Sequence, residues 1–301
     1  GLPVRGFLGR GLRSVEAGFR MAWSVGKALG IVRRFNPDVV AGFGSYAAFA
    51  PMLAARLLGL PTMLHEQNAI AGASNRVLAK LARRICLSLP DTEGFDPAKC
   101  VLTGNPVRAG VNEAGRLPRA RGARRLLVMG GSQGAHALNT FIVEHLAALR
   151  EAGVDIRHQT GSADEASVRA AYTAAGYDPS CVTAFIDDMA AAYAWADVAL
   201  CRSGATTVAE LCAAGLPSVL VPFPYAIHDH QTRNAEVLAK TGAAILVPES
   251  RMIEDGLAQT LIRLLNDSGE RTRMSSAALV SAWPDAAARV TTVLEEIARS
   301  R

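Results

Sequence analysis

The sequence predicts an α/β protein made of two doubly wound domains. Short apolar runs alternate along the chain with longer stretches of helical period, and strands that alternate with helices form parallel sheets covered by helices on both faces. The chain has 301 residues, of which half are apolar, so it is long enough to bury two cores of ordinary size. Two parallel-sheet domains are therefore the expected architecture.

The apolar runs place the expected strands at residues 38–42, 61–65, 83–88, 124–130, 154–159, 196–201, 217–223 and 243–248. The first half of the chain offers only two or three of these strands, which is few for a free-standing doubly wound sheet. We therefore expect this sequence to lack the strands that open the first domain, together with their loops.

The domain boundary is expected within residues 108–125, a polar segment that is rich in Gly and Arg and has no apolar periodicity. This gives a partial N-terminal domain over residues 1–118 and a second domain over 119–284. Residues 285–301 are expected to form a C-terminal helix that packs back on the first domain.

Composition limits the class of protein. The five cysteines occur singly, without a C-x-x-C pair, which argues against a zinc site or a disulfide framework and favours a reducing compartment. No secretory signal pattern is visible, and the longest apolar run, residues 46–60, is interrupted by Arg56 and is too short to span a bilayer. The net charge of +5 permits an acidic partner such as nucleic acid, an anionic membrane or a phosphorylated substrate.

Basic residues concentrate in residues 1–35, which contain one acid, Glu16, and interleaved apolar side chains. Such a segment can lie on a membrane surface. The same pattern suits a helix that packs its apolar side on the protein and leaves its basic side in water. The two interpretations are compatible, and both stay open.

Ligands of doubly wound folds bind at the carboxyl ends of the strands, where two glycine turns stand out here. In LLVMGGSQGAHALN, a strand leads through a tight turn to a helix that begins near Ala135, which leaves the amides of Ser132, Gln133, Gly134 and Ala135 to face an anion. An ordinary strand-to-helix turn is the alternative. Binding of NAD is disfavoured, because the glycine spacing differs from G-x-G-x-x-G and the next strand does not end in an acid.

The second turn, CRSGATTVAE, repeats this geometry. After Gly204, the first helical turn exposes the amides of Thr206 and Thr207, and the carboxylate of Glu210 follows one turn later. An amide cluster suits phosphate, and a carboxylate can accept two hydrogen bonds from a ribose diol. The alternative is that Glu210 is a solvated helix acid.

The stretch FIDDM follows a short expected strand. Its Phe185 and Ile186 could pack on a nucleotide base, while Asp187 and Asp188 are interpreted as acids that open a helix rather than as metal ligands. In TGNPVR, Arg108 is a candidate bidentate partner for phosphate or a carbonyl edge, with a surface arginine as the alternative.

Four polar residues follow one another at the end of the second expected strand: His65, Glu66, Gln67 and Asn68. Packing does not require such a cluster, so we interpret it as functional. Taken singly, His65 could be a core histidine, and Glu66 could pair with Arg76 or Arg83.

Together the motifs GFGSY, LHEQNAIAG, TGNPVR, GGSQGA, FIDDM, CRSGATTVAE and DHQTRNA resemble the MurG family of bacterial cell-wall glycosyltransferases, part of glycosyltransferase family 28. The similarity runs along the whole chain, in the same order and spacing. It implies a GT-B fold, in which two Rossmann-like domains face each other across a cleft, with the sugar nucleotide on the second domain and the lipid acceptor on the first.

The resemblance implies that N-acetylglucosamine is transferred from UDP-N-acetylglucosamine to lipid I, the undecaprenyl-linked muramyl pentapeptide, with inversion, giving lipid II for peptidoglycan. It implies no cofactor, no metal and no nucleic-acid partner. It also implies a peripheral position at the cytoplasmic face of the plasma membrane, with the anionic inner surface as a partner.

The resemblance also implies roles for single residues. Asn68 and Gln231 are expected near the donor sugar, Arg108 and Ser132 on the nucleotide, the Ile186 backbone on uracil and Glu210 on the ribose. The full expected set of substrate-binding residues is Asn68, Arg108, Ser132, Gln133, Ile186, Met189, Ala205, Thr206, Thr207, Val208, Ala209, Glu210 and Gln231.

Two departures from the family pattern concern Ser45, where glycine is usual, and His230, where some relatives have glutamine. A third concerns catalysis: the family opens with a strand and a glycine-rich loop whose histidine is the usual candidate base, and this sequence is expected to start after it. The base is therefore unassigned, with His65 and Glu66 as substitutes. The alternatives to a working transferase are a UDP-sugar-binding module without catalysis and an NAD-linked oxidoreductase.

Overall fold

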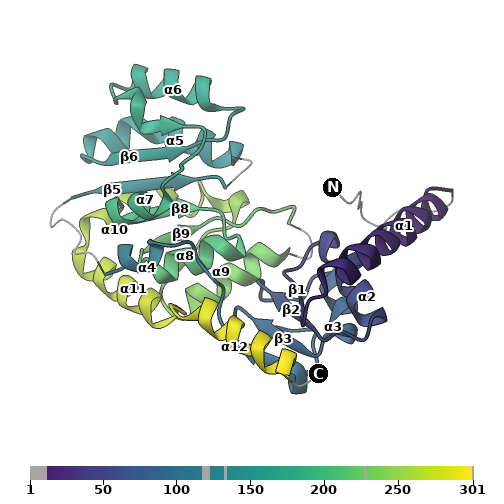
Figure 1. Cartoon of the computed structure of the whole chain (residues 1–301). Coiled ribbons are helices and arrows are strands. Elements are labelled where there is room, and N and C mark those ends of the chain that lie inside the picture. Colours follow the sequence, from purple (N-terminus) through teal and green to yellow (C-terminus); the bar gives the residue numbers. More distant parts are fainter. Residues whose placement is uncertain (1–11, 117–122, 132–133, 227–228, 300–301) are drawn as a thin grey trace. The chain divides into compact units, whose positions relative to one another are not determined.

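The computed structural model describes residues 12–116, 123–131, 134–226 and 229–299 (Figure 1). The chain forms two compact units, and each contains one fully parallel sheet. The first unit consists of Gly1–Asn105 and Asp285–Arg301, and the second of Pro106–Pro284. Every strand expected from an apolar run is present, which confirms the α/β prediction.

The sheet of the first unit has the strand order β1-β2-β3-β4. Its strands are β1 Val40–Gly42, β2 Thr62–Glu66, β3 Arg84–Leu87 and β4 Cys100–Leu102. Its helices are α1 Leu12–Phe35, α2 Phe49–Leu57, α3 Ala73–Leu81 and α12 Ala286–Arg299, with short 3-10 turns at Tyr46–Ala48 and Pro97–Lys99. The expectation of two or three strands missed β4, because the apolar run of this edge strand is only three residues long.

Both faces of the first sheet are covered. On one face, Met52 of α2 and Leu78 of α3 pack against Leu64 and Ile85. On the other face, α12 packs three apolar side chains, Val290, Val293 and Ile297, against Met63 and Cys86. The C-terminal helix thus belongs to the first unit although it follows the second in sequence.

Helix α1 lies along α2 (Figure 1). Its buried side chains Ser24, Ala28 and Val32 repeat every four residues, and the two apolar ones pack in a cluster with alanines of α2. Trp23 and Phe35, on another face of the same helix, are 51% and 79% exposed. No helix within the described residues is long and apolar enough to cross a membrane.

The sheet of the second unit has the strand order β10-β9-β8-β5-β6-β7. Its strands are β5 Arg125–Met129, β6 Asp155–Gln159, β7 Val182–Thr183, β8 Val198–Cys201, β9 Ser218–Leu220 and β10 Ala244–Leu246. Its helices are α4 Val111–Ala114, α5 His136–Glu151, α6 Glu165–Ala174, α7 Met189–Trp195, α8 Ala205–Ala213, α9 His230–Lys240, α10 Leu257–Asn266 and α11 Ser268–Val280, with 3-10 turns at Pro179–Cys181 and Glu249–Arg251.

Alternate residues of these strands enter two different cores, as the period of a strand requires. Leu126 and Val128 of β5 pack with α5, α6 and α10, whereas Leu127 and Met129 pack with α7, α8 and α9. The chain winds from β5 to β7 on one side of β5 and from β8 to β10 on the other. The switch in direction lies between β5 and β8, and doubly wound sheets bind their ligands at the carboxyl ends of the strands at such a point.

The boundary between the units lies after Asn105 rather than after residue 118. The segment that was expected to be a linker contains α4, whose Val111 and Ala114 are buried in the core of the second unit. Two apolar residues three positions apart were too weak a pattern to mark a one-turn helix.

Candidate functional site

A hollow of about 150 Å³ opens at the carboxyl edge of the second sheet, at the switch point between β5 and β8. Residues at the ends of β5, β6 and β8, or just after β5, β7 and β8, converge on it. The hollow is lined by Arg108, Met129, Gly131, Gln159, Phe185, Ile186, Met189, Tyr193, Cys201, Arg202, Thr206, Thr207 and Glu210.

The glycine turn after β5 borders this hollow. A Cβ atom at Gly130 would lie 2.3 Å from the backbone nitrogen of Ala135, and one at Gly134, where φ is +76°, would lie 2.2 Å from the carbonyl oxygen of Thr160. Both positions therefore require glycine. The helix predicted near Ala135 begins at His136. The predicted nucleotide contacts Ser132 and Gln133 lie outside the described residues.

Gln159, at the end of β6, fastens the glycine turn. Its side-chain oxygen accepts a hydrogen bond from the Gly130 amide at 3.2 Å, and its NH2 group donates to the carbonyl oxygens of Gly131 and Ala184 at 3.1 and 2.9 Å. One side chain thus ties the turn to the segment that leads to Ile186. Gln159 is the non-acidic strand end that argued against NAD, and the sequence pattern gave no sign of its hydrogen-bond partners.

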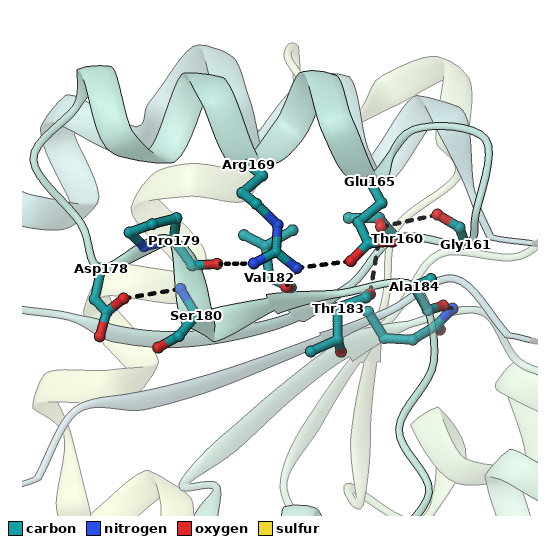
Figure 2. Close-up of polar contacts among 11 residues, drawn as sticks. Thr160, Gly161, Glu165, Arg169, Asp178, Pro179, Ser180, Val182, Thr183 and Ala184 are labelled. Atoms are coloured by element: carbon teal, nitrogen blue, oxygen red, sulfur yellow. Dashed lines mark hydrogen bonds and ion pairs between the residues drawn. The ribbon is translucent and has the colours of Figure 1, made fainter.

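The segment before Ile186 is also held by α6, as Figure 2 shows. The Arg169 guanidinium donates to the carbonyl oxygens of Pro179 and Val182 at 3.2 and 2.7 Å and pairs with Glu165. The Thr160 hydroxyl lies within hydrogen-bonding distance of the Thr183 carbonyl. These bonds fix the end of β7 and hence the chain that follows it.

Beyond β7, the apolar residues Phe185, Ile186 and Met189 line the hollow. The Asp188 carboxylate caps α7 by accepting a hydrogen bond from the Ala191 amide at 2.9 Å. Asp188 is therefore a helix cap, as the sequence indicated. Among the described residues, no group of three or more His, Cys, Asp and Glu side chains could hold a metal ion.

Helix α8 presents its N-terminus to the hollow. Gly204 is its N-cap, and Thr206 and Thr207 of the first turn are lining residues. Free amides and the helix dipole make this end suitable for an anion. Of the other residues predicted on this turn, Ala205, Val208 and Ala209 do not line the hollow, and Val208 is buried in the core.

Glu210 lies one turn further along α8 and is only 3% exposed, so it is not a solvated helix acid. The Tyr193 hydroxyl donates to its Oε2 atom at 2.9 Å. Arg108 Nε lies 3.4 Å from Oε1, close enough for an ion pair, but Oε1 has no hydrogen-bond partner among the described residues. Tyr193 was missed by sequence analysis, because nothing in the pattern relates α7 to Glu210.

Gln231, in the first turn of α9, is hydrogen-bonded to the segment that follows β8, although it does not line the hollow itself. Its side-chain oxygen accepts hydrogen bonds from the amides of Ser203 and Phe223 at 3.3 and 3.0 Å. Arg202 supports the same segment, because its guanidinium donates to the carbonyl oxygens of Val221 and Pro222 and pairs with Glu249.

His65 and Glu66, the substitutes considered for a catalytic base, are buried in the first unit at 0% and 1% exposure. His65 lies 3.1 Å through Nε2 from the Gly104 carbonyl and 3.1 Å through Nδ1 from the Gln67 NH2 group. Because the amide must donate, Nδ1 accepts and Nε2 carries the proton. Burial lowers the pKa of His65. Both nitrogens are occupied, so this histidine is a core histidine rather than a base.

Glu66 holds the loop that follows β2. Its Oε1 accepts from the backbone and side-chain nitrogens of Asn68, and its Oε2 accepts from the Gly72 amide and the Asn75 side chain. The suggested pairing of Glu66 with Arg76 or Arg83 is not what the structure shows. Asn68 is thus positioned by this loop in the first unit, and both predicted base substitutes have structural roles instead.

Comparison with known proteins identifies relatives over both units. The profile of the glycosyltransferase family 28 C-terminal domain matches residues 125–290, and that of the N-terminal domain matches residues 2–87. A curated protein of Nitratidesulfovibrio vulgaris strain DP4 is 51% identical over 304 residues, covering all of this chain and 83% of its own length. Its name is UDP-N-acetylglucosamine--N-acetylmuramyl-(pentapeptide) pyrophosphoryl-undecaprenol N-acetylglucosamine transferase. A Lawsonia intracellularis protein of the same name is 47% identical and covers 92% of this chain and 78% of its own length.

Solved structures support the same family assignment. The crystal structure of Acinetobacter baumannii MurG is 36% identical, with a TM-score of 0.74, and covers 93% of this chain and 81% of its own. A putative UDP-N-acetylglucosamine 2-epimerase from Listeria monocytogenes has a TM-score of 0.64 at 15% identity, which indicates a shared fold alone. The predicted GT-B class, with two Rossmann-like units, is confirmed.

Proposed function

This chain belongs to glycosyltransferase family 28, and we therefore propose that it transfers N-acetylglucosamine from UDP-N-acetylglucosamine to lipid I. Lipid I is the N-acetylmuramyl-(pentapeptide) pyrophosphoryl-undecaprenol named in the relatives, and the product is lipid II of peptidoglycan synthesis. The observation that carries the proposal is the hollow of the second unit, which combines an apolar wall, a helix N-terminus and a buried carboxylate.

These three features match the three parts of uridine diphosphate. The wall formed by Phe185, Ile186 and Met189 suits the uracil ring, and backbone groups at Ile186 can meet its edge. The N-terminus of α8 suits the diphosphate, and Glu210 suits the ribose hydroxyls, since a carboxylate accepts hydrogen bonds from both.

The other predicted residues extend this assignment. Arg108, which borders the hollow, is proposed to contact the nucleotide, as are Ser132 and Gln133 of the glycine turn. Asn68 and Gln231 are proposed to contact the donor sugar. In Gln231 the side-chain oxygen is already used by backbone amides, so the NH2 group is the part of this side chain suited to a sugar oxygen.

The chemistry is an inverting displacement. A hydroxyl oxygen of the acceptor forms a bond to the anomeric carbon, the bond from that carbon to the diphosphate oxygen breaks, and the hydroxyl proton passes to a base. The charge that develops on the leaving diphosphate is stabilised by amides and the helix dipole at the start of α8. We assign the base to neither His65 nor Glu66, because both are committed to internal hydrogen bonds.

Calorimetric titration with UDP-N-acetylglucosamine, UDP-glucose and NAD tests the donor site. We expect UDP-N-acetylglucosamine to bind most tightly and Glu210→Ala to weaken its binding at least tenfold, because the ribose loses its acceptor. Glu254→Ala, which removes an exposed acid from the same unit, is the matched control and is expected to bind as the wild type does. Tight NAD binding would contradict the proposal and favour an oxidoreductase.

Transfer is tested separately, with lipid I and radiolabelled UDP-N-acetylglucosamine. Formation of labelled lipid II is the expected result. Selective binding of the donor without transfer would instead identify this chain as a UDP-sugar-binding module.

We further propose that the protein docks peripherally on the anionic cytoplasmic surface of the plasma membrane, through the first unit. Trp23, Lys27, Ile31 and Phe35 repeat every four residues along one exposed face of α1, and the Lys27 ammonium lies 3.7 Å from the centre of the Trp23 ring. Aromatic and basic side chains on one helix face are suited to the headgroup region of a membrane.

A second feature of the first unit supports the same proposal. A hollow of about 570 Å³ at the amino ends of β2 and β3 is lined by five basic residues and no acid: Arg56, Lys80, Arg83, Arg84 and Lys99. Such a concentration of positive charge attracts anionic headgroups.

Co-sedimentation with vesicles tests docking. We expect stronger binding to phosphatidylglycerol-containing vesicles than to phosphatidylcholine vesicles at low salt, and a loss of that preference in Arg56→Glu/Lys80→Glu. Lys240→Glu/Arg251→Glu, with the same charge change in the second unit, is the control. Equal binding to both kinds of vesicle would refute the electrostatic part of the proposal.

A further inference from the structure

Tyr193 and Glu210 form a buried pair beside the proposed nucleotide. Their exposed fractions are 1% and 3%, and the hydroxyl of Tyr193 donates to Oε2 of Glu210 at 2.9 Å. Both residues line the hollow of the second unit. Burial is the main cause that raises the pKa of Tyr193 well above its ordinary value, so its hydroxyl remains a hydrogen-bond donor.

The two oxygens of this carboxylate are not equivalent. Oε2 is occupied by Tyr193, whereas Oε1 is buried without a hydrogen-bond partner among the described residues, in a side chain that borders the hollow. A buried acceptor without a hydrogen bond is costly, and a ligand hydroxyl in the hollow would remove that cost.

The orientation of the carboxylate depends on Tyr193. The last torsion of a glutamate side chain is soft, with no sharp staggered minima, so packing alone does not fix the plane of the carboxylate. Arg108 Nε, 3.4 Å from Oε1, belongs to a half-exposed side chain and is a weak restraint. The hydrogen bond from Tyr193 comes from a ring packed in the core between α7 and α8 and is the stronger restraint.

We propose that Tyr193 is a positioning residue that holds Glu210 with Oε1 toward the ribose, so that discrimination between ribose and 2′-deoxyribose depends on the Tyr193 hydroxyl. This inference rests on the proposed function, which places a UDP-sugar in the hollow. The tyrosine ring fills the core as a phenylalanine would, and the hydroxyl adds only the bond to Glu210. A single substitution, Tyr193→Phe, therefore separates the packing of the ring from the hydrogen bond to Glu210.

The test is calorimetric titration of the full chain and its Tyr193→Phe variant with UDP and with 2′-deoxy-UDP. For the wild type we expect UDP to bind at least tenfold more tightly. In Tyr193→Phe we expect the Kd for UDP to rise about tenfold and that for 2′-deoxy-UDP to change less than about twofold, because a hydrogen bond to a charged group is among the stronger ones.

Tyr172→Phe is the matched control. Tyr172 is also fully buried in the second unit, but its hydroxyl contacts the ring of His158, 2.9 Å away, rather than Glu210. In Tyr172→Phe, the ratio of the Kd for 2′-deoxy-UDP to that for UDP is expected to stay as in the wild type. A structural role of Tyr193 would weaken both ligands equally and leave the ratio unchanged, which would overturn the inference.

The same titration separates failure of the inference from failure of the proposed function. If the wild type binds UDP more tightly than 2′-deoxy-UDP and Tyr193→Phe keeps that ratio, only the role of Tyr193 is wrong. If the wild type binds neither ligand while its circular dichroism shows a folded chain, the proposed donor site is wrong and the inference falls with it.

Discussion

Glu66 and Glu210 are two buried carboxylates at the carboxyl edges of the two sheets, and they do different things. Glu66 receives four hydrogen bonds from Asn68, Gly72 and Asn75, so the protein itself uses both of its oxygens. Glu210 receives one from Tyr193 and keeps Oε1 without a hydrogen-bond partner in the described structure. Burial alone therefore does not mark a carboxylate as a candidate for ligand binding, whereas a buried acceptor oxygen without a hydrogen bond, beside a hollow, does.

The largest expected effect is on stability and compares Glu66→Gln with Glu210→Gln. Each oxygen of Glu66 accepts from a backbone amide, so either orientation of a glutamine leaves one backbone N–H facing an NH2 group. We expect Glu66→Gln to cost about 2–3 kcal/mol and Glu210→Gln less than about 1 kcal/mol, because Tyr193 can still donate to an amide oxygen. Urea unfolding followed by circular dichroism measures both. Equal losses of stability in the two variants would contradict the different roles assigned to the two carboxylates.

The next effect concerns pH, because each unit also buries a histidine. Burial lowers the pKa of His158 in the second unit to about 3 and also lowers that of His65 in the first unit. Because the pKa of each histidine is lower in the folded state, the folded state binds fewer protons than the unfolded state. The contribution of each histidine to the free energy of unfolding is therefore complete above pH 6.5. It decreases as the pH falls toward the folded-state pKa. Between pH 7 and pH 5 we expect His158 alone to reduce stability by about 2 kcal/mol.

Urea unfolding at the two pH values, for the wild type and His158→Gln, measures this contribution. The variant is expected to show a smaller loss on acidification, since it has no group to protonate. Ser167→Ala, at an exposed position of the same unit that carries no titratable group, is the control and should keep the wild-type pH dependence. An unchanged pH dependence in His158→Gln would contradict the assignment.

A smaller effect is expected at Gln159, the side chain of the second unit that resembles Glu66 in using all its polar atoms internally. In Gln159→Glu a carboxylate oxygen would face the carbonyl oxygens of Gly131 and Ala184. We expect a loss of about 1–2 kcal/mol in stability and weaker UDP binding as the glycine turn shifts. Calorimetry and urea unfolding measure the two effects, with Gln259→Glu as the exposed control. Unchanged UDP binding would show that the turn does not need Gln159.

The smallest effect is expected at Ser45, in the loop after β1. Its backbone has φ 65° and ψ 158°, a conformation that is essentially restricted to glycine. Ser45→Gly should therefore raise stability by about 0.5–1 kcal/mol. Differential scanning calorimetry would show a higher Tm, whereas Ala48→Gly, at an ordinary φ of −73°, should lower it. A lower Tm in Ser45→Gly would mean that the serine contributes more than its backbone costs.

Much of the fold follows from local patterns. The strands and the helix starts near Ala135 and Gly204 were predicted because apolar runs and glycine turns report on a few neighbouring residues. Strand β4 and helix α4 were missed because each has only three or four residues, and their place depends on partners distant in sequence. The boundary at residue 118 was wrong for the same reason.

The fold class, the family and seven of the residues that line the hollow follow from the sequence: Arg108, Phe185, Ile186, Met189, Thr206, Thr207 and Glu210. The glycine turn and helix start after β8 place Thr206, Thr207 and Glu210 locally, whereas Met189 followed only from the family resemblance. Which polar groups already have partners inside the protein is visible only in the folded structure. It removed His65 and Glu66 as candidate bases and brought Gln159 and Tyr193 to the site. Hydrogen bonds between residues far apart in sequence depend on packing, and a linear pattern carries no record of them.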